Sequence, residues 1–220
     1  MQQTEKQKRS VGSWVRIFLF FGASLLFFIL ADRAMEARQV QLGIADKVIR
    51  FHVLANSDST EDQELKLKVR DAVGLMMKDR LQSAETVDES RRIIKQSLGD
   101  IETCAKEVIL REGYAYEVEA SLANSSFPVK TYGTASFPAG TYEALRVVIG
   151  AGEGHNWWCV MYPNLCFAGS MYEVDEERSK QQLREVLSPE EYETVMEDGD
   201  YQVRFRFLTF LNRIFSDDAK

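Results

Sequence analysis

The sequence predicts an α+β protein in which a largely antiparallel sheet is flanked by two long N-terminal helices and a C-terminal helical segment, after an N-terminal signal or anchor helix. Three observations lead to this prediction. An uninterrupted apolar run stands near the N-terminus, and two long apolar stripes of helical period follow one short strand. Segments that alternate with period two then fill the middle of the chain, joined by so few residues that they are expected to pair antiparallel.

Residues 1–31 have the pattern of an export signal. Four basic residues precede an apolar run at 17–31, which includes Ile17, Leu25, Phe28 and Ala31. As a helix this run is about 22 Å long, short of the roughly 30 Å core of a bilayer, so a signal peptide is favoured over a spanning helix. No A-x-A cleavage pattern follows, and an uncleaved membrane anchor stays an alternative. In both cases the rest of the chain is expected outside the cytoplasm, with the membrane contacted only through this segment.

One strand and two helices are predicted after a polar, helix-permissive linker at residues 32–46. Residues 47–54 alternate as a strand, with Arg50 and His52 on one face and Phe51 on the other. Capping signals mark the start of each helix: Ser59 with Asp62 or Thr60 with Gln63 for the first, and Thr86 with Glu89 for the second. Gly113 is placed to end the second helix.

The remainder is predicted to hold more strands and the C-terminal helical segment. Strands are expected at residues 114–122, 128–136, 142–149 and 201–207. A helix is expected near 175–187, and Ser188-Pro189-Glu190-Glu191 carries the signals that begin another. Residues 47–215 are therefore expected to form a single globular domain with a short tail at 216–220.

The charge of the chain excludes a common class of partner. The net charge is −7, and removal of residues 1–31 leaves 23 Lys and Arg against 33 Asp and Glu, a net charge of −10. Nucleic-acid binding normally shows as clustered Lys and Arg on a basic domain. We therefore expect no nucleic-acid partner.

A cluster of cysteines and aromatic residues at 152–167 is the candidate functional stretch. In an oxidising compartment Cys159 and Cys166 can persist as a disulfide, which would contribute roughly 2.5 kcal/mol by closing a loop of about eight residues. Rigid aromatic side chains are enriched at binding hot spots, although they also fill cores. Strand alternation places adjacent tryptophans on opposite faces, one for the core and one for a partner. The candidate partner contacts are Asn156, Trp157, Trp158, Tyr162 and Phe167.

Other chemistry is weaker in this sequence. Cys159 with His155 could form the nucleophile and base of an exported hydrolase only if the loop were helical, which the glycines and tryptophans oppose. ANSDSTEDQE at 55–64 spaces oxygen ligands like a calcium loop but lacks its glycine and its final glutamate, so a helix cap is favoured. Cys104 is expected to be a plain buried thiol. We predict no catalytic residue, metal or cofactor.

Three long blocks resemble a known family. RFHVLANSDSTEDQELKLKVRDAV at 50–73, YGTASFPAGTYEALRVVIGAGEG at 132–154 and NWWCVMYPNLCF at 156–167 closely resemble the stage II sporulation protein R family of endospore-forming bacteria. Two positions depart from the family pattern: Asn164 stands where a second proline is expected, and His155 occupies a variable place. The resemblance implies a protein without enzyme activity, exported from the forespore into the intermembrane space of the sporangium. There it would activate a membrane-embedded aspartic protease of the mother cell, which then processes the precursor of sigma factor E.

Overall fold

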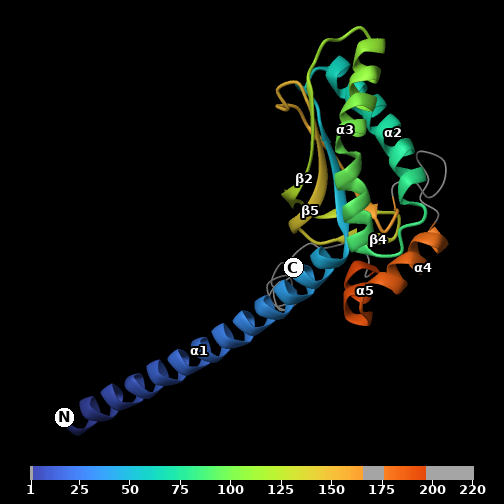
Figure 1. The fold of residues 1–220 in the computed structure, drawn as a ribbon. Helices are drawn as coiled ribbons and strands as arrows, with labels where there is room; N and C mark the ends of the chain where they lie inside the picture. The colour runs from blue at the N-terminus through green and yellow to red at the C-terminus, as the bar shows by residue number, and fades with distance from the viewer. Residues whose placement is uncertain (1, 166–175, 197–220) are drawn as a thin grey trace, which may run out of the picture. The chain divides into compact units, whose positions relative to one another are not determined.

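A computed structural model describes residues 2–165 and 176–196 of the 220-residue chain (Figure 1). The chain divides into two compact units, Met1–Val40 and Gln41–Lys220. Within the described residues one helix and one strand are followed by two helices, five strands and two more helices, and an α+β architecture with an N-terminal apolar helix is confirmed.

The N-terminal apolar segment is part of one long helix, α1 (Gln2–Lys47). Its part from Ile17 to Lys47 is long and apolar enough to cross a membrane, a property that signal sequences near an N-terminus share. Residues 32–46, predicted as a linker, are helical because they consist mostly of good helix formers and contain no proline. The last turns of α1 belong to the second unit, in which Ile44 is fully buried.

The main sheet has four strands in the order β2-β5-β1-β6 and is mixed. Its strands are β1 (Ile49–Leu54), β2 (Val118–Phe127), β5 (Gly140–Ile149) and β6 (Asn156–Tyr162). β5 pairs antiparallel with β2, and β1 pairs antiparallel with β6. β1 and β5 are parallel neighbours, a long-range pairing that the sequence did not predict.

Two strand predictions differ from the structure. The strand expected at 114–122 starts at Val118 and continues to Phe127. The strand expected at 128–136 is wrong, because this segment is a hairpin of β3 (Lys130–Tyr132) and β4 (Ala135–Phe137). Its two-residue turn contains Gly133 at φ 58°, a conformation that interrupts any single strand and that glycine adopts without strain. The predicted strand at 142–149 is confirmed.

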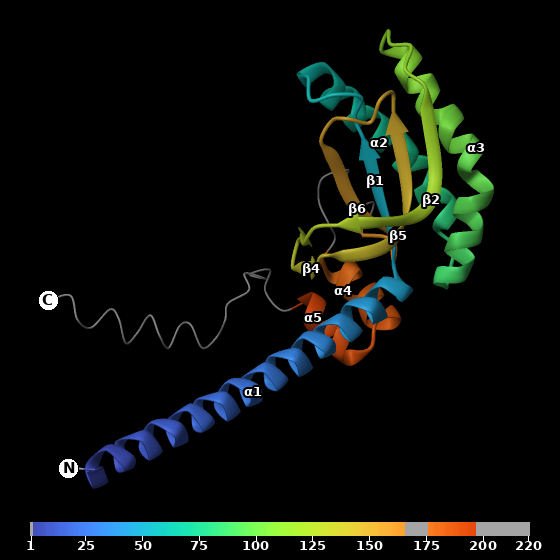
Figure 2. The same cartoon turned by 90° about the vertical axis from the view of Figure 1, so that its left-hand side faces the viewer.

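Two long helices, α2 (Thr60–Leu81) and α3 (Val87–Arg111), cover one face of the sheet; in Figure 2 α2 lies behind the strands and α3 lies beside β2. Their predicted caps are confirmed, with Ser59 as the N-cap of α2 and Thr86 as the N-cap of α3. The core lies between the two layers, because alternate residues of each strand face the helices. From β1 these residues are Ile49, Phe51 and Val53, all fully buried.

The C-terminal helical segment is confirmed as α4 (Glu176–Val186) and α5 (Pro189–Met196). Ser188 and Glu191 form a reciprocal capping box, in which the Ser188 backbone N–H donates to the Glu191 carboxylate at 2.7 Å. The same carboxylate accepts a hydrogen bond from Lys47 at 2.6 Å, which ties the end of α1 to α5 within the second unit. The predicted strand at 201–207 and the tail at 216–220 lie outside the described residues.

Candidate functional site

Two loops meet at one end of the sheet and form the candidate site. Residues 55–59 connect β1 to α2, and residues 150–155 connect β5 to β6. Because β1 and β5 are parallel, both loops follow the C-terminal ends of their strands at the same end of the sheet, where α/β sheets commonly bind ligands. Residues 55–59 and 150–154 lie in two of the three stretches that resemble the family, the third stretch begins at the first residue of β6, and His155 lies between the second and the third. We call residues 55–59 and 150–155 the loop pair.

Backbone contacts lock the loop pair together. The Gly154 N–H donates to the carbonyl of Ala55 at 3.0 Å, and the Glu153 N–H donates to the carbonyl of Asn56 at 3.2 Å. A Cβ on Gly154 would stand 2.2 Å from the carbonyl oxygen of Ser57, so only glycine allows this approach. The two loops therefore form one surface with fixed geometry.

Asp62 at the start of α2 fixes the first loop, residues 55–59, by hydrogen bonds. Its carboxylate accepts hydrogen bonds from Asn56 at 2.9 Å and from the Ser57 hydroxyl at 2.6 Å. Burial alone would raise the pKa of Asp62, but the hydrogen bonds from Ser57, Asn56 and Tyr116 outweigh burial and lower this pKa. Asn56 also accepts from the Ala151 N–H at 3.0 Å, so one amide side chain joins both loops to the helix.

The predicted helix cap is confirmed at ANSDST. Among the described residues, no group of three or more His, Cys, Asp or Glu side chains is arranged to hold a metal ion. The oxygen-bearing side chains of this loop are used instead in hydrogen bonds that fix the start of α2.

His155 and Asp58 form the exposed tip of the loop pair. The His155 backbone N–H donates to the Asp58 carboxylate at 2.6 Å, and its ring Nδ1 contacts the same oxygen. The hydrogen bonds from His155 lower the pKa of Asp58. The His155 side chain is 81% exposed, so the tip is open to contact by another molecule.

The geometry opposes the hydrolase alternative. His155 immediately precedes β6 and is exposed, whereas Cys159 lies within this strand and is only 3% exposed. Four residues of extended strand separate their Cα atoms by about 13 Å. A base at this distance cannot take the proton of the thiol directly.

The adjacent tryptophans lie on opposite faces of β6, as strand alternation predicts. Trp157 faces the helices, with its ring edge-on to Phe51 at 5.7 Å between centroids and the Arg70 guanidinium 4.8 Å from its centroid. Trp158 faces the other way and stacks on His52 at 5.0 Å. Both tryptophans are half-buried, so neither is a fully enclosed core residue.

The sheet face that carries Trp158 has a buried charge that the sequence analysis did not interpret. Arg50 is fully buried, and its guanidinium carbon lies 4.4–5.7 Å from the centroids of four rings, those of Phe127, Tyr132, Phe137 and Tyr142. It donates to the Cys159 carbonyl at 3.0 Å and to the Tyr132 hydroxyl at 2.9 Å, and burial lowers its pKa. The β3–β4 hairpin therefore closes one part of this face over Arg50.

His52 lies beside this charge on the same face. Its side chain is 4% exposed, and burial, followed by the charges of Arg146 and Arg50, lowers its pKa from 6.5 to about 4. A neutral imidazole is therefore stacked on Trp158 and contacts the tilted ring of Phe127. The signal for this arrangement was an Arg and a His spaced by two on a strand, which period-two alternation puts on one face.

The other predicted site residues have different environments. Asn156 is half-buried, but Tyr162 is 9% exposed and its hydroxyl donates to the Glu85 carbonyl at 2.9 Å, as expected of a core residue rather than an exposed contact. Phe167 and Cys166 lie outside the described residues, so the disulfide between Cys159 and Cys166 stays a prediction. Cys104 is a half-buried thiol on α3 whose pKa is raised by burial.

Comparison with known proteins gives one family. A family model described as stage II sporulation protein R matches residues 45–172, which include the loop pair and β6. A relative named stage II sporulation protein R, from Bacillus subtilis (strain 168), is 34% identical over 224 aligned positions that cover 95% of this chain and all of the relative. No solved structure matches the chain. The chain therefore belongs to the stage II sporulation protein R family.

Proposed function

We propose that this protein is an exported sporulation signal that activates a membrane-embedded aspartic protease of the mother cell across the intermembrane space. Activation of this protease leads to processing of the sigma factor E precursor. The observation that carries the proposal is family membership, because the match to the sporulation protein of Bacillus subtilis covers 95% of the chain.

The N-terminal helix supports export. Ile17, Leu25 and Phe28 are exposed on α1, in a segment whose length and composition suit a signal or an anchor. A basic stretch before such a segment normally stays in the cytoplasm, so the second unit would be delivered to the far side of the membrane. This side would also allow the predicted disulfide of Cys159 to form.

The loop pair and Trp158 are the surface that we assign to the protease. A protein ligand acts by binding one state of its target better than another, which requires a surface of fixed shape. The loop pair is fixed by the hydrogen bonds of Asn56, and His155 is exposed at its tip. Trp158 is half-buried on the sheet face that points away from the helices.

The proposal is tested in sporulating cells that lack their own copy of the gene. The double variant Leu25→Asp, Phe28→Asp places two charges in the apolar part of α1, and we expect the protein to stay in the cytoplasm without precursor processing. The control Leu75→Asp, Leu110→Asp makes the same change at two exposed positions of α2 and α3. We expect the control to signal normally, whereas normal processing from the cytoplasmic variant would contradict the proposal.

A further inference from the structure

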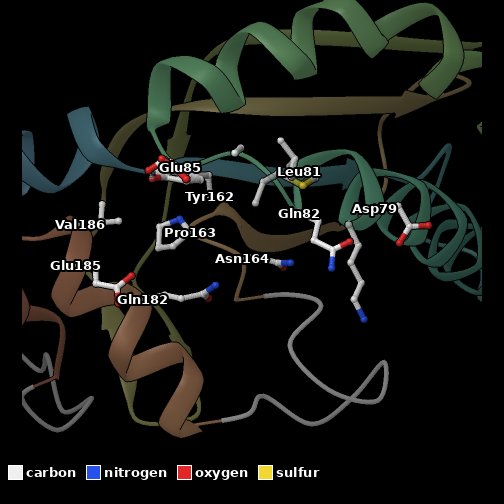
Figure 3. Close-up of a pocket in the computed structure, with 13 residues that line it drawn as sticks. Asp79, Leu81, Gln82, Glu85, Tyr162, Pro163, Asn164, Gln182, Glu185 and Val186 are labelled. Atoms are coloured by element: carbon white, nitrogen blue, oxygen red, sulfur yellow. Dashed lines mark hydrogen bonds between the residues drawn. The ribbon is translucent and has the colours of Figure 1, made fainter.

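A cavity of about 580 Å³ lies away from the loop pair, beside the end of β6 (Figure 3). Its walls come from the C-terminal end of α2, the loop that leads to α3, the residues that follow β6, and α4. This volume is within the range of sites that hold small molecules or a buried side chain. Leu81, Met161 and Val186 give the cavity apolar walls.

Two amide side chains in this cavity have unused hydrogen-bonding groups. Oδ1 of Asn164 and Oε1 of Gln182 are both buried, and neither accepts a hydrogen bond within the described residues. A buried acceptor without a donor destabilises the folded chain. Asn164 follows β6 and Gln182 lies on α4, so two separate segments leave an acceptor unsatisfied at the same cavity.

The charged side chains around the cavity are mostly acidic and favour a cationic ligand. Asp79, Glu85 and Glu185 line it, with Lys78 as the single basic residue among its lining side chains. The effect reaches Tyr162 in the wall, whose pKa is raised by burial and then by Glu185 and Glu89. Negative potential, unsatisfied acceptors and apolar walls together fit a cationic donor on an apolar stem.

We propose that this cavity binds an arginine side chain of a partner polypeptide. A guanidinium has five N–H donors in a planar fork, enough to reach two amide oxygens and a carboxylate together, and its three-carbon stem suits the apolar walls. The chain's own residues 166–175, which follow closely after the wall residue Asn164, contain no Lys or Arg and cannot supply the cation. The proposal does not depend on the identity of the protease.

The test is a titration of the full chain, held in neutral detergent micelles, with N-acetyl-argininamide, followed by saturation-transfer NMR. We expect saturable binding in the millimolar range and at least tenfold weaker binding of N-acetyl-citrullinamide, which keeps the shape and loses the charge. The tripeptide acetyl-Gly-Arg-Gly-amide is expected to bind at least as tightly as the free amide, because the site serves a polypeptide.

Variants locate the binding in this cavity. Glu185→Gln is expected to weaken binding at least threefold, and Gln182→Met, which removes the unsatisfied amide, should do the same. Glu177→Gln removes one charge from the same helix outside the cavity and is expected to bind like the unmodified chain. If Gln182→Met does not fold, the affinity measured with Glu185→Gln, a change at an exposed residue, decides the test. Equal binding of the citrulline compound, an unchanged affinity in Glu185→Gln, or no saturable binding would each overturn the proposal.

Discussion

His52 makes the stability of the fold depend on pH in a defined window. The folded chain holds its imidazole neutral, with a pKa of about 4 because the ring is buried next to Arg146 and Arg50. In the unfolded chain the imidazole binds a proton below its ordinary pKa of 6.5. Stability from His52 is therefore fully present above pH 6.5 and is lost as the pH falls toward 4.

The two pKa values of His52, folded and unfolded, set the size of this effect. The difference between 6.5 and about 4 corresponds to a limit of about 3 kcal/mol. Between pH 7 and pH 4.5 the expected loss of unfolding free energy is about 2.4 kcal/mol. The lowered carboxyl pKa values of Asp58, Asp62 and Glu191 start from 3.8 or 4.5, so their contributions are lost mainly below this window.

Urea unfolding of the full chain in neutral micelles, followed by tryptophan fluorescence at pH 7, 5.5 and 4.5, measures this loss. His52→Phe keeps a ring against Trp158 but cannot titrate, so less than half of the loss should remain. The chain has two histidines, and His155→Phe at the exposed tip is the matched control with the wild-type pH dependence. The reasoning is refuted if His52→Phe keeps the full loss or if His155→Phe removes it.

Three further predictions concern the loop pair and β6. Asn56→Ala removes the amide that joins both loops to Asp62 and should lower the unfolding free energy by about 2–3 kcal/mol; a loss below about 0.5 kcal/mol would show that the amide does not fix the loops. Alkylation of the exported protein without reductant, followed by mass spectrometry, should leave Cys159 and Cys166 unmodified, and alkylation of both would reject the disulfide. Trp157→Ala should cost about 3 kcal/mol in urea unfolding because the ring packs on the core, whereas Trp158→Ala should impair precursor processing with a smaller loss of stability; normal processing by Trp158→Ala would reject this contact.

Local signals in the sequence predicted where the helices start. Ser59, Thr86 and Ser188 cap their helices as the sequence indicates, because a cap depends on residues only a few positions away. The alternation of residues 142–149 predicted β5 equally well, because the alternation of buried and exposed residues along a strand does not depend on which strand it pairs with. Fold class and helix starts were therefore accessible from the sequence.

Long-range pairings were not accessible in the same way. β1 and β5 are about ninety positions apart, and their parallel pairing depends on packing that no local pattern reports. The turn at Gly133 was missed because the residues on both of its sides favour strands, and a single glycine decided between one strand and a hairpin.

The candidate site was predictable in part. The sequence pointed to Trp157, Trp158 and their opposite faces, and alternation sufficed for this. It could not show that Tyr162 is buried against the Glu85 carbonyl, because this contact joins β6 to the loop between two helices. The sequence also could not predict the four aromatic rings around Arg50, because two of them belong to the β3–β4 hairpin, which was predicted as a single strand.

The proposed function requires that this chain, once exported, switches on a membrane-embedded aspartic protease. Its most direct test is co-expression of the full chain, the protease and the sigma factor E precursor in a bacterium that does not sporulate, with precursor processing measured on immunoblots. The claim predicts processing when all three proteins are present and none when the chain is omitted or carries Leu25→Asp, Phe28→Asp. Equal processing with and without the chain, or no processing with all three present, would contradict it.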